Sequence, residues 1–122
     1  MSIAGDVYRR RRDTLAAAMR KQGIAAVRFE DFENMRSPSL RYLCGHPGDA
    51  FLVIDSSGAS ILVAWDRTMA DKMAFVDKVF SYTDSGRRSE TALRRVLEEL
   101  GIPRGGRIEL PSATSYPRYV DH

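Results

Sequence analysis

The stretch AFLVIDSSGASILVA, residues 50–64, decides the fold class of this chain. It consists of two apolar runs, 50–54 and 60–64, on either side of a short segment that is rich in Ser and contains Gly58. Two apolar runs around such a loop predict a β-hairpin. A hairpin makes at least one pair of strands antiparallel, so a sheet that also contains helix-connected strands is mixed.

A helix pattern and a strand pattern precede the hairpin. Apolar side chains recur every three to four residues over 6–22, which predicts a helix with Asp6 as its N-cap. Gly23 suits the end of this helix, because glycine adopts a left-handed conformation without a steric clash. The apolar segment 24–29 predicts a strand at a central position. A polar connection over 30–39 and a short apolar element then lead to the hairpin.

The segments after the hairpin continue the alternation of helix and strand. In chain order we expect a helix over 67–75 capped by Asp66, a strand over 76–82, a helix over 90–100 capped by Ser89, a strand over 107–110 and a terminal helix from Pro111 onward. Alternating helices and strands predict a layered α/β fold. We therefore expect a single domain over 1–122, with a mixed β-sheet of about five or six strands and helices on both faces.

The composition is that of an ordinary globular domain. The chain has 122 residues, of which 43% are hydrophobic and 29% charged, so it is too apolar for a disordered chain. Its longest apolar run is far shorter than the roughly 20 residues that a membrane span needs, and its N-terminus lacks the apolar core of a secretory signal. The one cysteine, Cys44, excludes an internal disulfide. We expect a cytoplasmic protein without a membrane partner.

A run of four arginines at 9–12 is the most prominent charged feature. Consecutive helical residues point about 100° apart, so these side chains cannot form one basic stripe. No aromatic residue is interleaved with them to stack on a base, and the net charge is only +3. We therefore expect solvated side chains, with one or two arginine stems covering the sheet, and no nucleic-acid partner.

Few side chains have the spacing of a catalytic or metal site. Cys44 and His46 are close enough for a nucleophile and its base, but no third orienting group follows, so Cys44 is better interpreted as a small buried hydrophobe. Glu30, Asp31 and Glu33 are interpreted as a solvated loop, because no histidine supports a metal site there. We predict no catalytic and no metal-ligating residue in this chain.

Several short motifs follow one another in a characteristic order. The sharpest is SLRYLCG at 39–45, and Trp65-Asp66-Arg67 with Ala70 comes directly after the hairpin. These segments resemble the "N-I-x-Y-L-T-G" turn and the "D-x-R-Y…A" segment of the N-terminal domain of the creatinase/prolidase family, which includes Xaa-Pro dipeptidases and aminopeptidases. The resemblance extends from about Arg11 to Tyr119. His46 is a departure, since it stands where the family commonly has an aromatic residue.

The resemblance implies a non-catalytic role for this chain. In that family two divalent metal ions (Mn, Co or Zn) are held by Asp, Asp, His, Glu and Glu of a C-terminal catalytic domain, and those motifs do not occur here. The chain would be the N-terminal domain of a metal-dependent Xaa-Pro dipeptidase- or aminopeptidase-like hydrolase, with no cofactor of its own. Its partners would be the catalytic domain of the same chain and the second subunit of a homodimer.

Three residues are predicted to face the substrate entrance or the dimer partner: His46, Trp65 and Arg67. Such a role implies an apolar patch that is exposed when the domain is isolated. Two alternatives remain open, namely a stand-alone protein-interaction module built on the same scaffold and the N-terminal domain of a creatinase- or ectoine-hydrolase-like enzyme. The presence or absence of the five metal ligands in the downstream coding sequence distinguishes the interaction module from the two kinds of enzyme.

Overall fold

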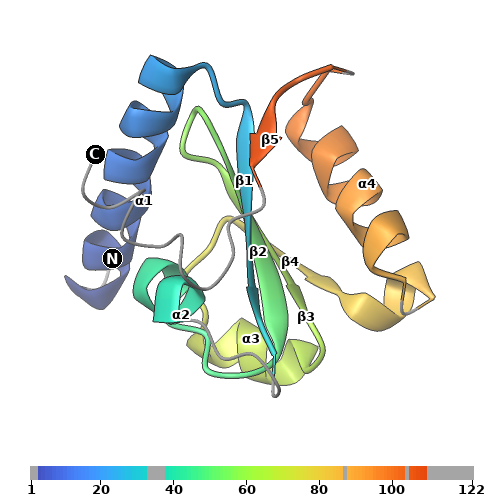
Figure 1. Ribbon diagram of the computed structural model, residues 1–122. Coiled ribbons are helices and arrows are strands. Elements are labelled where there is room, and N and C mark those ends of the chain that lie inside the picture. Colours follow the sequence, from blue (N-terminus) through green and yellow to red (C-terminus); the bar gives the residue numbers. More distant parts are fainter. Residues whose placement is uncertain (1–2, 33–37, 87, 104, 110–122) are drawn as a thin grey trace.

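A computed structural model describes residues 3–32, 38–86, 88–103 and 105–109. The elements are, in chain order, α1 (Ile3–Gln22), β1 (Ala26–Asp31), α2 (Pro38–Cys44), β2 (Ala50–Asp55), β3 (Ser60–Ala64), α3 (Arg67–Met73), β4 (Lys78–Ser81), the 3-10 helix η1 (Tyr82–Ser85), α4 (Ser89–Leu100) and β5 (Ile108–Glu109). The strands form one sheet in the order β4-β3-β2-β1-β5 (Figure 1).

The predicted hairpin lies at the centre of this sheet. β2 pairs antiparallel with β3, Ala50 opposite Ala64, and antiparallel with β1 on its other side. β4 is parallel to β3, and β5 is parallel to β1. β1, β3, β4 and β5 therefore all end at the same end of the sheet, the lower end in Figure 1, which we call the carboxyl end. The opposite end, where the hairpin turns, is called the amino end.

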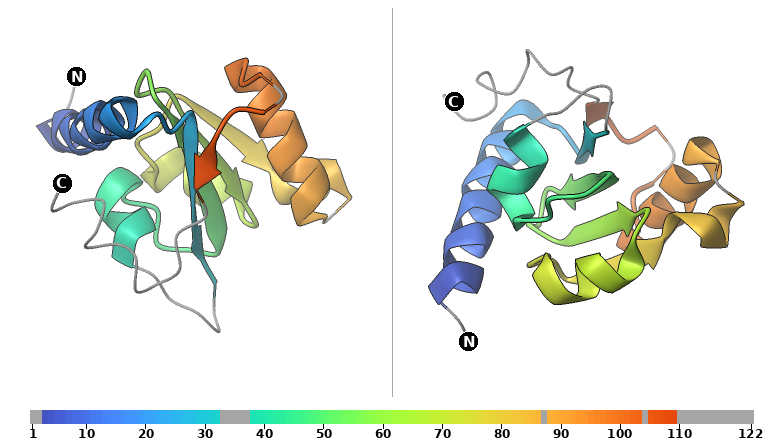
Figure 2. Two further views of the ribbon diagram at one scale, coloured as in Figure 1. Left: turned by 45° about the horizontal axis from the view of Figure 1, so that its top comes forward. Right: turned by 90° about the horizontal axis from the view of Figure 1, so that it is seen from below.

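Side chains alternate between two separate hydrophobic cores, one on each face of the sheet. Helices α1, α2 and α3 cover the first face, and α4 alone covers the second, as Figure 2 shows from two directions. The first core includes Leu15, Met19, Leu40, Val27, Phe29, Leu52, Ile54, Leu62 and Ala70. The second includes Ala26, Phe51, Val53, Ile61, Val63, Ala92 and Val96. The predicted mixed α/β sheet with helices on both faces is confirmed.

The arginine run is divided between solvent and the interior. Arg9 and Arg10 are exposed, whereas Arg12 is only 4% exposed. The guanidinium of Arg12 donates to the carbonyl oxygen of Leu43 at 2.9 Å and to that of Phe75, so it ties α1 to the ends of α2 and α3. The prediction that these side chains form no single stripe is confirmed. None of the helices in the described segments combines the length and the apolar composition of a membrane span.

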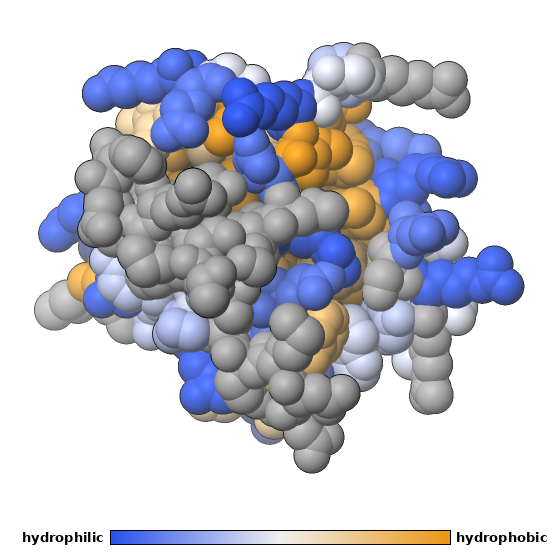
Figure 3. Space-filling view, in the orientation of Figure 1, coloured by the Kyte–Doolittle hydropathy of each residue, from blue (hydrophilic) through white to orange (hydrophobic). Residues whose placement is uncertain are grey.

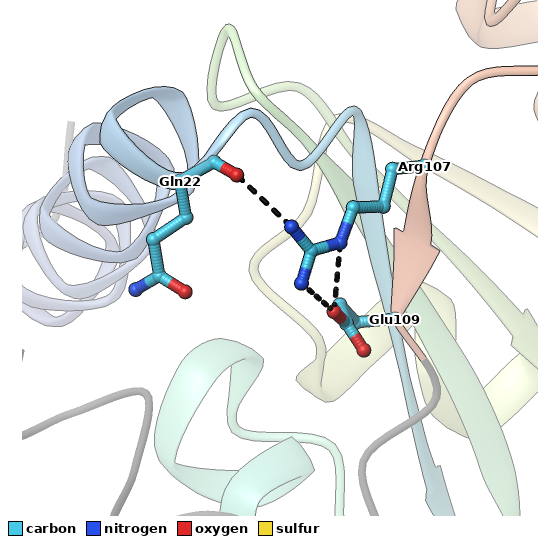
Figure 4. A network of polar contacts seen from close by, with 3 residues as sticks. All are labelled: Gln22, Arg107 and Glu109. Carbon is cyan, nitrogen blue, oxygen red and sulfur yellow. Dashed lines mark hydrogen bonds and ion pairs between the residues drawn. The ribbon is translucent and has the colours of Figure 1, made fainter.

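The short edge strand β5 is fastened by a polar network (Figure 4). Arg107 donates to the Gln22 carbonyl oxygen at 3.2 Å and to Glu109 at 2.8 and 3.1 Å. A cation at the last carbonyls of a helix also interacts favourably with the helix dipole, so the contact supports the end of α1. Figure 3 shows apolar side chains gathered between β5 and α4. Ile102 and Ile108 pack against the second hydrophobic core.

Some predicted boundaries and caps need correction. α1 begins at Ile3, so Asp6 lies in its first turn and is not the N-cap. β1 is shifted by two residues, to Ala26–Asp31, because the chain needs Gly23 and the two residues after it to leave the helix. α3 ends at Met73 instead of 75. α4 begins with Ser89, whose predicted place as the cap is taken by Arg88.

The remaining predictions agree more closely with the structure. Gly23 has a φ of +71° and ends α1 as expected. Asp66 is the N-cap of α3, where its carboxylate accepts from the backbone N–H of Met69 at 3.0 Å. The predicted terminal helix from Pro111 onward lies outside the described residues.

Candidate functional site at the carboxyl end of the sheet

The three predicted site residues come from different segments but lie at the same end of the sheet. His46 belongs to the connection 45–49 between α2 and β2, Trp65 follows β3, and Arg67 begins α3. The connection and the end of β3 meet because β2 begins where β3 ends, and the Trp65 backbone N–H donates to the carbonyl oxygen of Asp49 at 3.1 Å. The fold therefore brings these segments together, although their side chains have different environments.

Trp65 is the centre of an aromatic cluster that consists of Phe32, Trp65 and Tyr82. Its ring stacks on that of Tyr82, with centroids 3.8 Å apart and planes at 10°, and it meets the ring of Phe32 edge-on at 5.0 Å. Trp65 nevertheless remains 37% exposed. The cluster joins residues that directly follow β1, β3 and β4, so it crosses the carboxyl end of the sheet. The sequence offered no periodic signal for this grouping, because it arises from strand order.

The imidazole of His46 is buried in the connection 45–49. Its exposure is 0%, and neither Nδ1 nor Nε2 has a hydrogen-bond partner in the described part of the chain. Burial lowers the pKa of His46, with the carboxylates of Asp66, Asp31 and Asp49 acting in the opposite direction. The ring is thus held in its neutral form inside the molecule, whereas Trp65 and Arg67 are at the surface.

Asp31 is a site residue that the sequence reasoning missed. It ends β1, is 0% exposed, and lies with one carboxylate oxygen 3.4 Å from Nε of Arg41. Arg41 also donates to the carbonyl oxygen of Pro47 at 3.2 Å and thereby spans the connection that carries His46. The interpretation of Asp31 as part of a solvated loop is wrong, because β1 extends two residues further than its apolar run; Glu33 lies outside the described residues.

Cys44 is not a nucleophile in this arrangement. Its side chain is buried, and its thiol donates to the carbonyl oxygen of Leu40 at 3.2 Å. Burial raises the pKa of the thiol to about 11, so the reactive thiolate is scarce at neutral pH. The interpretation of Cys44 as a small buried hydrophobe is confirmed.

Arg67 is an exposed residue with one neighbouring partner. Its Nε lies 3.7 Å from a carboxylate oxygen of Asp71, one helical turn further along α3, and both side chains are more than half exposed. An exposed pair of this kind holds a side chain only weakly. Arg67 is consequently available to another molecule.

A surface hollow of about 320 Å³ lies at the amino end, lined among others by Asp55, Asp77, Lys78 and Glu99. Its acidic groups are occupied: Asp55 and Asp77 accept from backbone N–H groups at 2.8 to 3.0 Å, and Glu99 pairs with Lys78. In residues 3–32, 38–86, 88–103 and 105–109, no three metal-ligating side chains are grouped so that they could share one ion.

A comparison of the chain with protein-family models finds no match, and neither does a comparison with curated proteins.

Proposed function

We propose that this chain is the non-catalytic N-terminal domain of a metal-dependent Xaa-Pro dipeptidase- or aminopeptidase-like hydrolase. In this proposal the carboxyl end of the sheet contributes to dimerisation and to the wall of the active-site entrance. The observation that carries it is Trp65, a large aromatic side chain that is 37% exposed where four strands end. Large aromatic side chains of this type dominate the binding energy of protein interfaces.

Two features of the site support an interface over an enclosed catalytic pocket. The Trp65 ring is already fixed by its contacts with Phe32 and Tyr82, so its presentation to a partner costs little conformational entropy. Arg67, two residues further along the chain, adds a weakly held cation at the surface, as the rim of an interface does. His46 contributes indirectly. Its buried ring belongs to the connection 45–49, and Asp49 of the same connection accepts the backbone N–H of Trp65.

The motif order supports the family part of the proposal. The segment SLRYLCG forms most of α2 and the turn after it, and the hairpin and the Trp65-Asp66-Arg67 segment follow in the order that the resemblance requires. The hydrolytic chemistry and its two divalent metal ions would belong to the C-terminal catalytic domain of the parent protein. A creatinase- or ectoine-hydrolase-like parent would use this domain in the same way.

The reading frame beyond codon 122 tests the proposal. We expect it to continue into a segment with the ordered ligands Asp, Asp, His, Glu and Glu. A stop codon, or a continuation without these ligands, would overturn the proposal that the parent protein is a hydrolase. The exposed Trp65 would then favour the second candidate, a stand-alone protein-interaction module.

A further inference from the structure

The connection 45–49 holds the ring of His46 where an N–H group of the ring has no hydrogen-bond acceptor among the described residues. His46 is completely buried, and both of its ring nitrogens lack a hydrogen-bond partner among the described residues. The packing around the ring is close, since a Cβ atom added at Gly48 would lie 3.2 Å from Nε2 of His46 and 3.2 Å from Sδ of Met69. The neutral ring packs there like an apolar side chain, but it loses the hydrogen bonds that it would make with water.

The charged groups that act on this ring come from every element around it. They are Asp31 at the end of β1, Arg41 on α2, Asp49 on the connection itself and Asp66 at the N-terminus of α3. Cys44, at the end of α2, stays a neutral thiol because burial raises its pKa to about 11. Three carboxylates thus favour a positive ring, but none of their oxygens is bonded to it. A protonated ring gains a hydrogen bond only if the ring or one of these carboxylates shifts from its present position.

Movement of the ring would be transmitted to Trp65 by the backbone. Gly48 and Asp49 directly follow His46 and Pro47, and the carbonyl oxygen of Asp49 accepts the backbone N–H of Trp65 at 3.1 Å. Ala50, the next residue, begins β2 opposite Ala64. One backbone hydrogen bond thus joins the connection directly to Trp65, whose ring belongs to the aromatic cluster.

We propose that His46 is an acid-sensitive latch: its protonation releases the connection 45–49 from α2 and α3 and loosens Trp65 from its stack on Tyr82. The latch is a property of this chain alone and goes beyond the proposed function, so it holds or fails independently of it. At a pH above the midpoint of the His46 titration, the ring is neutral and Trp65 is stacked on Tyr82. At a pH below that midpoint, the ring is charged and the surface around Trp65 changes its shape.

The chain provides its own reporter for this test. Trp65 is the only tryptophan, and His122 is the only other histidine. We would record tryptophan fluorescence between about pH 8 and pH 5, a window above the ordinary titration range of carboxyl groups. The expected result is a reversible change with its midpoint below the ordinary histidine value of about 6.5, present in the wild type and in His122→Gln and lost in His46→Gln.

A transition that survives in His46→Gln, or no transition in the wild type, would overturn the latch. If His46→Gln does not fold, the wild type alone decides, through the two imidazole Cε1–H signals in an NMR titration. The latch requires that one histidine titrates below the other and that the Trp65 indole N–H signal shifts with the same midpoint. Two histidines with equal, ordinary midpoints would contradict it.

Discussion

At the amino end of the sheet, Asp55 accepts three hydrogen bonds within the hairpin turn, whereas at the carboxyl end the His46 ring is buried with neither nitrogen bonded. Buried polar groups in proteins are normally bonded, and exceptions concentrate where a structure has a function to perform. The proposed recognition surface thus lies at the end of the sheet that holds a buried imidazole without a hydrogen bond among the described residues.

The largest effect is expected from Asp55→Ala at the amino end. This change leaves the backbone N–H groups of Ser57 and Ala59 without the carboxylate that now accepts them at 2.9 and 3.0 Å. Because Asp55 is only 8% exposed, we expect a loss of about 3 kcal/mol in the free energy of unfolding, measured by denaturant titration. Ser57→Ala, which removes only the hydroxyl donor, is the matched control. A loss below about 1 kcal/mol for Asp55→Ala would contradict the view that the hydrogen bonds at the amino end stabilise the domain.

The next effect concerns the pH dependence of stability at the carboxyl end. Burial lowers the pKa of His46 in the folded chain, so the unfolded chain takes up a proton first as the pH falls. The free energy of unfolding should therefore decrease below about pH 6.5, by at most about 1.4 kcal/mol per pH unit. Denaturant titrations of the wild type and His46→Gln at several pH values measure this. Equal slopes in the two proteins would show that His46 does not cause the decrease.

A smaller effect is expected within the aromatic cluster. The stacked rings of Trp65 and Tyr82 should contribute about 1 kcal/mol beyond the area that they bury. A double-mutant cycle of Trp65→Leu and Tyr82→Leu, followed by circular dichroism, measures this coupling free energy. The same cycle with Met73→Leu in place of Tyr82→Leu serves as the control. A coupling near zero for both cycles would mean that the stack does not hold the cluster together.

The smallest effect belongs to Arg67. Its ion pair with Asp71 at 3.7 Å joins two exposed side chains on one helix, so Arg67→Ala should change the free energy of unfolding by less than about 0.5 kcal/mol. Asp71→Ala should give the same small change. A loss above about 1 kcal/mol would mean that Arg67 serves the stability of the domain and not its surface.

Local patterns in the sequence predicted most of the fold. The hairpin follows from two apolar runs around a Ser/Gly loop, the end of α1 from Gly23, and the start of α3 from Asp66, because each depends on neighbouring residues only. Helix starts were less predictable. α1 extends back to Ile3 past the expected Asp6 cap, since an acidic residue is equally favourable in the first turn.

The candidate site was predictable only in part. His46, Trp65 and Arg67 could be named because they stand at the ends of predicted elements, but their burial could not. A loop histidine is ordinarily exposed, whereas this one is 0% exposed and has charged groups from β1, α2 and the start of α3 around it. Asp31 and the aromatic cluster depend on the order of β1, β3 and β4 in the sheet, which is a non-local property.

The self-association of the chain tests most directly whether the carboxyl end meets a partner. Sedimentation equilibrium should be compared for the wild type, Trp65→Ala and Met73→Ala, the last removing another exposed large apolar side chain, on α3. We expect the wild type to dimerise, Trp65→Ala to raise the dimer Kd by about tenfold or more, and Met73→Ala to leave it within about twofold. A wild type that stays monomeric at every concentration, or a Trp65→Ala variant with an unchanged dimer Kd, would contradict the assignment of this end as the interface.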